Sequence, residues 1–304
     1  MPEFAVAEDV YSAIEEAAQL VGATCSREKV WPILTAHGKA LSEAGIVFNV
    51  TTGGRHVGDL DYSITMPPAV GDPYALALSN GLVTETDHPA SALIPDIQKR
   101  ISISDYLVDY GIGGSLNKIY PHYPQDMRTV SNTADIPSMP PALGENAAFF
   151  ARHGLDDVVM VGVDYQHKTA NVYFQLSAEK RLESKVILSM LREIGAPEPD
   201  ERLLSFAQGA FRVYVTLDWD SPKIHRISFA RPPGRGLMSS DVATLPTRIE
   251  PEIVQFLKSA PHTYAGERIQ IVAIKWSPDG ESLSFGSCYQ LSPLQRKILA
   301  PNEE

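Results

Sequence analysis

Apolar and polar residues alternate along short segments of this chain, and the pattern predicts β-strands that come in pairs. Between Phe211 and Asp218, for example, every second residue is apolar and the residues between them are polar or tyrosine. Period two is that of a strand, whose side chains point alternately to opposite faces. The expected pairs are Ile46–Thr52 with Asp59–Thr65, Ser104–Asp109 with Asn117–Tyr123, Val158–Asp164 with Thr169–Phe174, Phe211–Asp218 with Lys223–Ala230, and Ile269–Trp276 with Ser282–Gln290.

The segments between the strand pairs have helical spacing instead. In the first of them Val10, Ile14 and Val21 share one face, Glu15 and Glu16 share the other, and Gly22 ends the helix. Further amphipathic segments are Ala142–His153, Lys180–Gly195 and Pro251–Ala260. The chain therefore repeats one unit five times: two helical stretches, then a hairpin.

Ten antiparallel strands either split into two sheets or close into a barrel. The helices need an apolar sheet surface to cover, and a closed barrel inside a ring of helices provides one. We therefore predict an α+β fold, a ten-stranded antiparallel β-barrel surrounded by α-helices, in a single domain that spans residues 1–304.

If helices cover the apolar faces, the polar faces converge on the barrel interior. A ten-stranded barrel is wider than the roughly eight-stranded kind that side chains can fill. The interior would then be a wet chamber, suited to an amphiphilic ligand that carries phosphate. The alternative is a sheet with one face in water, in which Lys118 and Arg226 are ordinary charged residues at a rim. The segment Arg231–Gly236 is expected to be a mobile loop, or alternatively a lid over the barrel.

Composition excludes several classes of protein. The net charge of −11 argues against a general nucleic-acid or anionic-membrane surface. The two cysteines, Cys25 and Cys288, have no metal-binding spacing and indicate a reduced, cytoplasmic protein. Apolar runs all fall short of the roughly 20 residues that span a bilayer. We expect a cytoplasmic monomer.

Scattered blocks of sequence carry a resemblance to a known family. They are Tyr11–Ala18, Gly54–Asp61, Gly71–Tyr74, Ile136–Ala142 with Glu145-Asn146, Gly154–Asp156, and Tyr214–Trp219 with Lys223-Ile224. Over about Val10 to Leu299 the chain resembles the bacterial soluble aromatic prenyltransferases of the ABBA type. The resemblance implies the same ten-stranded barrel that the hairpins predict.

The resemblance also implies a reaction. Members join a dimethylallyl or geranyl group, supplied as its diphosphate, to an electron-rich aromatic acceptor such as a phenol, naphthoquinoid, indole or phenazine. The allylic cation is attacked by the ring in an electrophilic aromatic substitution. The alternative is a barrel of the same fold that binds a hydrophobic aromatic ligand without catalysis.

Roles for individual residues follow from the same resemblance. Lys118 and Arg226 would bind the diphosphate as cations, with Thr169 and Asn171 as hydrogen-bonding partners. Tyr120, Tyr173 and Tyr214 would form an aromatic wall that stabilises the allylic cation. The acceptor pocket would include Phe48, Met160, Phe211, Gly286, Cys288, Gln295 and Ile298. Strict alternation puts Phe211 on the outward face, so its assignment requires a β-bulge.

Two positions bear on how the diphosphate is held. Asp61 stands where magnesium-using members place an aspartate, which favours a Mg²⁺ ion bound by Asp61 and the diphosphate. Ser284 stands where the family often has a lysine. We therefore expect Arg212 or Lys275 to supply part of the missing positive charge.

Overall fold

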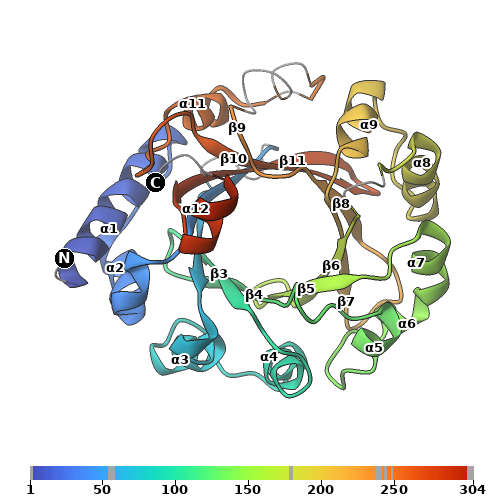
Figure 1. Ribbon diagram of the computed structural model, residues 1–304, viewed down its shortest axis with the longest axis horizontal. Helices are drawn as coiled ribbons and strands as arrows, with labels where there is room; N and C mark the ends of the chain where they lie inside the picture. The colour runs from blue at the N-terminus through green and yellow to red at the C-terminus, as the bar shows by residue number, and fades with distance from the viewer. Residues whose placement is uncertain are drawn as a thin grey trace.

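Ten strands close into one antiparallel barrel (Figure 1) in the structure, a computed structural model. It describes residues 3–53, 59–177, 181–236, 242, 245–247 and 249–299. Each strand pairs with its neighbours in turn, and the pairing of β1 with β11 completes the circle. The strands are β1 Ile46–Thr51, β2 Asp61–Met66, β3 Asp105–Gly111, β4 Leu116–His122, β5 Val158–Asp164, β6 Thr169–Gln175, β7 Arg212–Asp218, β8 Arg226–Ala230, β10 Ile269–Ser277 and β11 Gly280–Gln290. The predicted fold class and all five hairpins are confirmed.

Two loops differ from the sequence-based prediction. Strand β8 begins at Arg226 rather than Lys223, because the Asp218 carboxylate accepts hydrogen bonds from the N–H groups of Asp220 and Ser221 and extends the turn. The segment expected as a mobile loop contains β9, Gly234–Arg235, which pairs with the start of β10. The quoted block that begins at Gly54 lies partly outside the described residues.

Helices surround the barrel on its outside, as Figure 1 shows. They are α1 Glu3–Leu20, α2 Arg27–His37, α3 Pro73–Ser79, α4 Ala90–Gln98, α5 Val130–Ala134, α6 Ala142–Glu145, α7 Ala147–His153, α8 Ser184–Glu193, α9 Glu201–Gln208 and α11 Pro251–Ser259. The last helix, α12 (Pro293–Leu299), lies within the ring, over one end of the barrel. In the described residues, no helix combines the length and apolar character needed to cross a membrane.

The predicted helix Ala142–His153 is broken into α6 and α7 at Asn146. The Asn146 amide donates to the carbonyl oxygens of Ala142, at 2.8 Å, and Pro222, at 2.7 Å. Asparagine side chains compete in this way with the backbone bonds of a helix. The break ties the helical layer to the β7–β8 turn.

The hydrophobic core lies between the barrel and the helices. Outward residues of the strands, such as Val215 and Leu217, are fully buried there. Phe174 of β6 meets Phe150 of α7 with ring centroids 5.1 Å apart. The apolar face of each strand therefore packs against the helices, and the polar face lines the interior of the barrel.

Phe48 belongs to this core and not to an acceptor pocket, so that prediction is wrong. Its ring is fully buried and stacks on Tyr289, with centroids 5.5 Å apart. The reason is the strand period, because Val47 and Asn49 on either side of Phe48 point into the barrel.

Phe48→Ala is expected to lower the free energy of unfolding by about 3–5 kcal/mol, the usual cost of truncating a buried phenylalanine. Urea denaturation measures the change, with Val70→Ala at an exposed position as the control. Unchanged stability together with an altered acceptor preference would contradict the placement of Phe48.

Candidate active site

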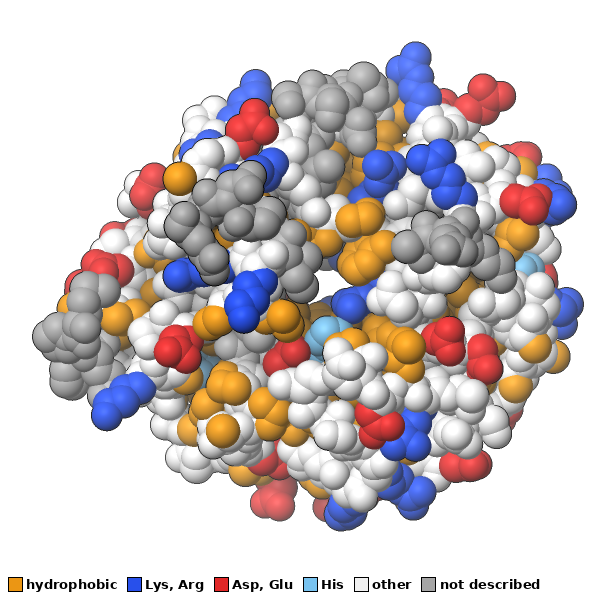
Figure 2. Space-filling model, in the orientation of Figure 1, with side chains coloured by type: hydrophobic (Ala, Val, Ile, Leu, Met, Phe, Trp, Pro, Cys, Tyr) orange, Lys and Arg blue, Asp and Glu red, His pale blue; other side chains and the backbone are white. Residues whose placement is uncertain are grey.

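The barrel encloses a cavity of about 1750 Å³, lined by residues from all ten barrel strands and from α12. Figure 2 shows the surface hollowed near α12, with basic and hydrophobic side chains around the opening. Ligand pockets in proteins usually measure about 300–1,000 Å³. The cavity therefore has room for two small molecules at once.

Most of the predicted site residues meet in this cavity. Those that line it are Asp61, Lys118, Tyr120, Met160, Thr169, Asn171, Tyr173, Phe211, Arg212, Tyr214, Arg226, Lys275, Gly286 and Gln295. Ile298 lies in α12, but its side chain falls outside the described part of the chain.

Two members of the predicted acceptor pocket are placed differently from expectation. Phe211 lines the cavity without a bulge, because β7 begins at Arg212 and the strand alternation does not extend to Phe211. Cys288 is absent from the cavity wall. Its side chain is buried in a small apolar cluster with Val47, Ile269 and Leu291.

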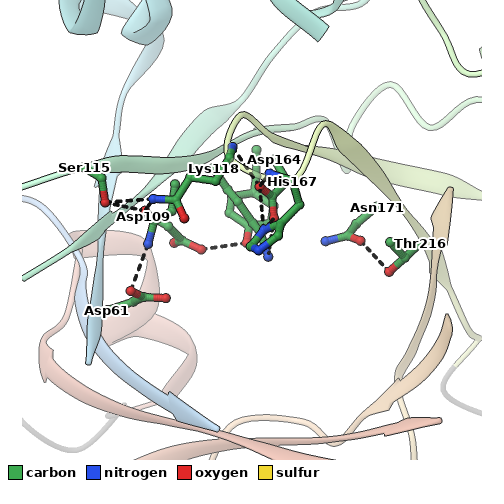
Figure 3. Close-up of polar contacts among 11 residues, drawn as sticks. Asp61, Asp109, Ser115, Lys118, Asp164, His167, Asn171 and Thr216 are labelled. Carbon is green, nitrogen blue, oxygen red and sulfur yellow. Dashed lines mark hydrogen bonds and ion pairs between the residues drawn. The ribbon is translucent and has the colours of Figure 1, made fainter. Parts of the chain in front are cut away.

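Three cations gather at the end of the cavity away from α12: Lys118, Arg226 and Lys275. Strand pairing brings two of them together, because Ser228, two residues from Arg226, pairs with Lys275. Lys118 forms an ion pair with Asp164, with Nζ and Oδ2 3.2 Å apart (Figure 3). The buried Nε of Arg226 has no hydrogen-bond partner among the described residues.

Carboxylates offset only part of the positive charge of the cation cluster, because the one close ion pair among the described residues joins Lys118 to Asp164. The pKa of Lys275 lies well below its usual range because burial disfavours the ammonium ion and because Arg226 and Lys118 repel it. An anion bound between these groups would remove that repulsion. The cluster is therefore a candidate site for a multiply charged ligand such as a diphosphate.

A hydrogen-bonding group lies beside the cations on β6 and β7. Thr216 donates to Oδ1 of Asn171 at 2.7 Å, as Figure 3 shows. This bond fixes the amide so that its NH₂ group is left to donate elsewhere. Thr169 lies on the same inward face of β6. Asn171 and Thr169 can therefore both donate hydrogen bonds to oxygens of a ligand held by the cations.

Asp61 ends a chain of hydrogen bonds on the opposite wall. Its Oδ1 accepts from Asn117 at 2.9 Å, and Asn117 accepts in turn from Ser115 and Gln166. Burial, with repulsion from Asp109, raises the pKa of the Asp61 carboxyl to about 7. An ionised Asp61 would be stabilised by a nearby cation.

The tyrosines form one continuous wall. Tyr173 stacks on Tyr214 with centroids 4.5 Å apart, and Tyr120 meets Tyr173 edge to face at 6.0 Å. The Tyr120 hydroxyl donates to Asp109 at 2.6 Å. Burial raises the pKa of both Tyr120 and Tyr173 well above the usual value, so both stay neutral.

Sequence reasoning missed several residues that build this site. Asp109 and Asp164 fix Tyr120 and Lys118, and Asn117 fixes Asp61. Gly162 provides the space for the Tyr120 ring, since a Cβ atom there would lie 2.5 Å from it. A glycine within the apolar run of β5 was the one available signal, because it marks a close approach.

Arg212 does not lie in the cation cluster. It is four residues from Thr216 on β7, about 13 Å along a strand, and Thr216 is the residue that pairs with Arg226. Tyr214 lies between them on the same face. The expectation that Arg212 replaces the charge missing at Ser284 is therefore not supported, whereas Lys275 is correctly placed for it.

The closed barrel has cations at one end and an aromatic wall beside them. This arrangement is that of an enzyme that binds a charged molecule and an aromatic molecule together. The chain matches the family described as aromatic prenyltransferase Orf2 over residues 5–296, and it belongs to this family. The predicted family and transferase activity are confirmed, and the non-catalytic alternative is not favoured.

Characterised relatives agree with this assignment. The chain is 43% identical over 255 residues to flaviolin linalyltransferase of Streptomyces virginiae, covering 83% of this chain and 82% of the relative. It is 38% identical over 301 residues to 5,10-dihydrophenazine-1-carboxylate 9-dimethylallyltransferase of Streptomyces anulatus, covering 98% of each.

A solved structure confirms the fold at low identity. The 5-dimethylallyl tryptophan synthase of Streptomyces coelicolor, solved with DMASPP and Trp, matches with a TM-score of 0.62 and 12% identity, over 93% of this chain and 94% of that one.

Asp61→Asn is expected to raise the melting temperature near about pH 8 and to raise it much less near about pH 4. The folded-state pKa of about 7 lies above the ordinary 3.8, so folding takes up a proton between these values and stability falls as pH rises through them. Thermal unfolding without magnesium or diphosphate measures this. Equal changes in melting temperature at both pH values would show that ionisation of the buried Asp61 carboxyl does not destabilise the fold.

Proposed function

We propose that this enzyme transfers a dimethylallyl or geranyl group from its diphosphate to an electron-rich fused aromatic ring. The observation that carries the proposal is the cation cluster of Lys118, Arg226 and Lys275 beside a wall of stacked tyrosines, inside one cavity. The names of two relatives specify a linalyl and a dimethylallyl group, with flaviolin and a dihydrophenazine carboxylate as acceptors.

The cluster would act on the leaving group. Lys118, Arg226 and Lys275 would bind the diphosphate, with Asn171 and Thr169 donating hydrogen bonds to its oxygens. As the bond between the allylic carbon and oxygen breaks, both electrons leave with the diphosphate. The cations then stabilise charge that grows in the transition state.

The tyrosine wall would act on the allylic cation. Aromatic faces attract cations electrostatically. The rings of Tyr120, Tyr173 and Tyr214 would therefore stabilise the allylic cation and take the place of water that would trap it. The barrel keeps the cation within a closed site until the ring attacks. Loss of a proton from the attacked carbon then restores aromaticity.

Magnesium is part of this proposal. Mg²⁺ is often held by one or two carboxylates together with substrate phosphates. Asp61 fits this arrangement, since Asn117 donates to one of its carboxylate oxygens, and burial with repulsion from Asp109 raises its pKa to about 7 despite Lys118 and Lys275 nearby. Among the described residues, no group of three or more His, Cys, Asp or Glu side chains could hold a metal, so the diphosphate would have to supply further ligands. The ion would neutralise charge on the diphosphate.

The proposal takes one chain as the catalytic unit, a monomer, because the strands of a single chain close the barrel around the cavity. Incubation with geranyl or dimethylallyl diphosphate, Mg²⁺ and a panel of dihydroxynaphthalenes, phenazines and indoles tests the reaction. Mass spectrometry should find a prenylated ring. Donor binding without product from any acceptor would contradict the proposal.

Arg226→Gln and Lys118→Gln are each expected to weaken donor binding by about tenfold or more, because each removes a charge-assisted hydrogen bond. Calorimetry with dimethylallyl thiolodiphosphate measures the affinity. Arg152→Gln, an exposed arginine on α7 that pairs with Glu193, is the matched control. Unchanged donor affinity in both site variants would show that neither Arg226 nor Lys118 binds the diphosphate.

Treatment with EDTA is expected to abolish turnover, and added Mg²⁺ should restore it. The same treatment should change the donor affinity of the parent enzyme far more than that of Asp61→Asn. Full activity after EDTA, or equal metal dependence in both proteins, would show that Asp61 holds no magnesium.

A further inference from the structure

A second cationic site lies at the α12 end of the cavity, where Arg212 begins β7. Its side chain is partly buried and lines the cavity together with His122, Asp105 and Phe211. The proposed reaction does not use it, because the diphosphate cluster lies at the other end. The function of a buried arginine here therefore needs its own explanation.

Hydrogen bonds hold the guanidinium in a fixed direction. Nε donates to Gln175 Oε1 at 3.2 Å, and Nη2 lies 3.0 Å from His122 Nε2. Arginine can only donate, so His122 Nε2 must accept, and the imidazole proton must lie on Nδ1. From there it is donated to Asp105, at 3.2 Å. His122 is thus a positioning residue for Arg212.

The arrangement leaves the Arg212 guanidinium without a carboxylate in direct contact among the described residues. Within the described residues it forms no direct ion pair with a carboxylate, and its Nη1 donates no hydrogen bond. Asp105 lies beyond a neutral imidazole. Burial lowers the pKa of Arg212, but arginine starts above about 12 and remains charged at neutral pH. A partly buried, oriented and unpaired guanidinium is suited to a planar anion.

An aromatic surface leads from this arginine to the reaction centre. The Phe211 ring lies 5.0 Å from the guanidinium carbon. Tyr214 is the next inward residue on β7, about 7 Å along the strand, and it stacks on Tyr173. Tyr173 pairs with Tyr214, which lies between Arg212 and Thr216 on β7, and Thr216 pairs with Arg226. A flat ring along this surface would have one edge at Arg212 and the other towards the diphosphate.

We propose that Arg212, oriented by His122 and Asp105, binds a carboxylate on the aromatic acceptor, so that the preferred substrates are fused-ring aromatic acids. This inference rests on the proposed prenyl transfer and adds the substrate class. The carboxylate pairs with the unpartnered face of the guanidinium, the ring stacks beside Tyr214, and the opposite edge of the ring receives the allyl group.

Matched acids and methyl esters test this. The probes are 1,4-dihydroxy-2-naphthoate and phenazine-1-carboxylate, each with its methyl ester, bound to the full enzyme in the presence of dimethylallyl thiolodiphosphate and Mg²⁺. Calorimetry should show each acid binding more tightly than its ester. Arg212→Gln should reduce this acid-to-ester ratio by about tenfold or more, the usual effect of losing a hydrogen bond to a charged group.

Variants separate recognition from folding. Arg212→Lys should retain part of the ratio because it keeps the charge but loses the planar fork. His122→Ala should lower the ratio as well, because the guanidinium is no longer oriented. Arg152→Gln should leave the ratio unchanged, and circular dichroism confirms that each variant is folded.

Several outcomes would overturn the inference. One is that no acid binds better than its ester, and another is that Arg212→Gln leaves the ratio intact. A third is that Arg212→Gln weakens donor binding as much as Arg226→Gln does, which would return Arg212 to the diphosphate. Failure of prenyl transfer is a separate result, seen as the absence of product from every acceptor, and the binding ratio tests Arg212 whether or not product forms.

Discussion

Repulsion among three basic side chains inside a closed barrel is the interaction on which the rest of this structure depends. Lys118, Arg226 and Lys275 share one end of the cavity, and only Lys118 has a close carboxylate partner among the described residues. Bringing basic groups together away from water is costly, so the free protein keeps an unfavourable arrangement that a bound anion would relieve. In the proposed reaction the same groups would stabilise a departing diphosphate, because they are already in position before the bond breaks.

The barrel can carry this charge because it is built with its polar side inward. Helices bury the outward faces of the strands, and that layer supplies the hydrophobic core. The interior is then free for chemistry rather than packing. Its contents are ordered along the strands: cations and Asp61 at one end, tyrosines in the middle, and Arg212 at the other end. A reaction between a charged donor and a flat acceptor fits this order.

Strand alternation accounts for how much of the molecule the sequence could predict. It located the hairpins to within a few residues, and it explains why Arg226, Asn171 and Lys118 share a cavity. The family resemblance assigned Phe48 to the acceptor pocket, whereas the structure places it on the outward face of β1, in the core. Alternation could not predict how far Arg212 lies from the other cations along the barrel axis. That distance depends on the order and register of the strands, which cannot be read from the sequence of one strand. Asp109 and Gly162 were missed for a similar reason, since their roles exist only relative to Tyr120 on another strand.

The most direct test of the central claim is a crystal structure of the full chain with dimethylallyl thiolodiphosphate. The account predicts both phosphates at the end of the barrel away from α12, with phosphate oxygens within hydrogen-bonding distance of Arg226 Nε, Lys118 and Asn171, and the allyl group against Tyr173 and Tyr214. Phosphates bound at Arg212, or outside the barrel, would contradict it.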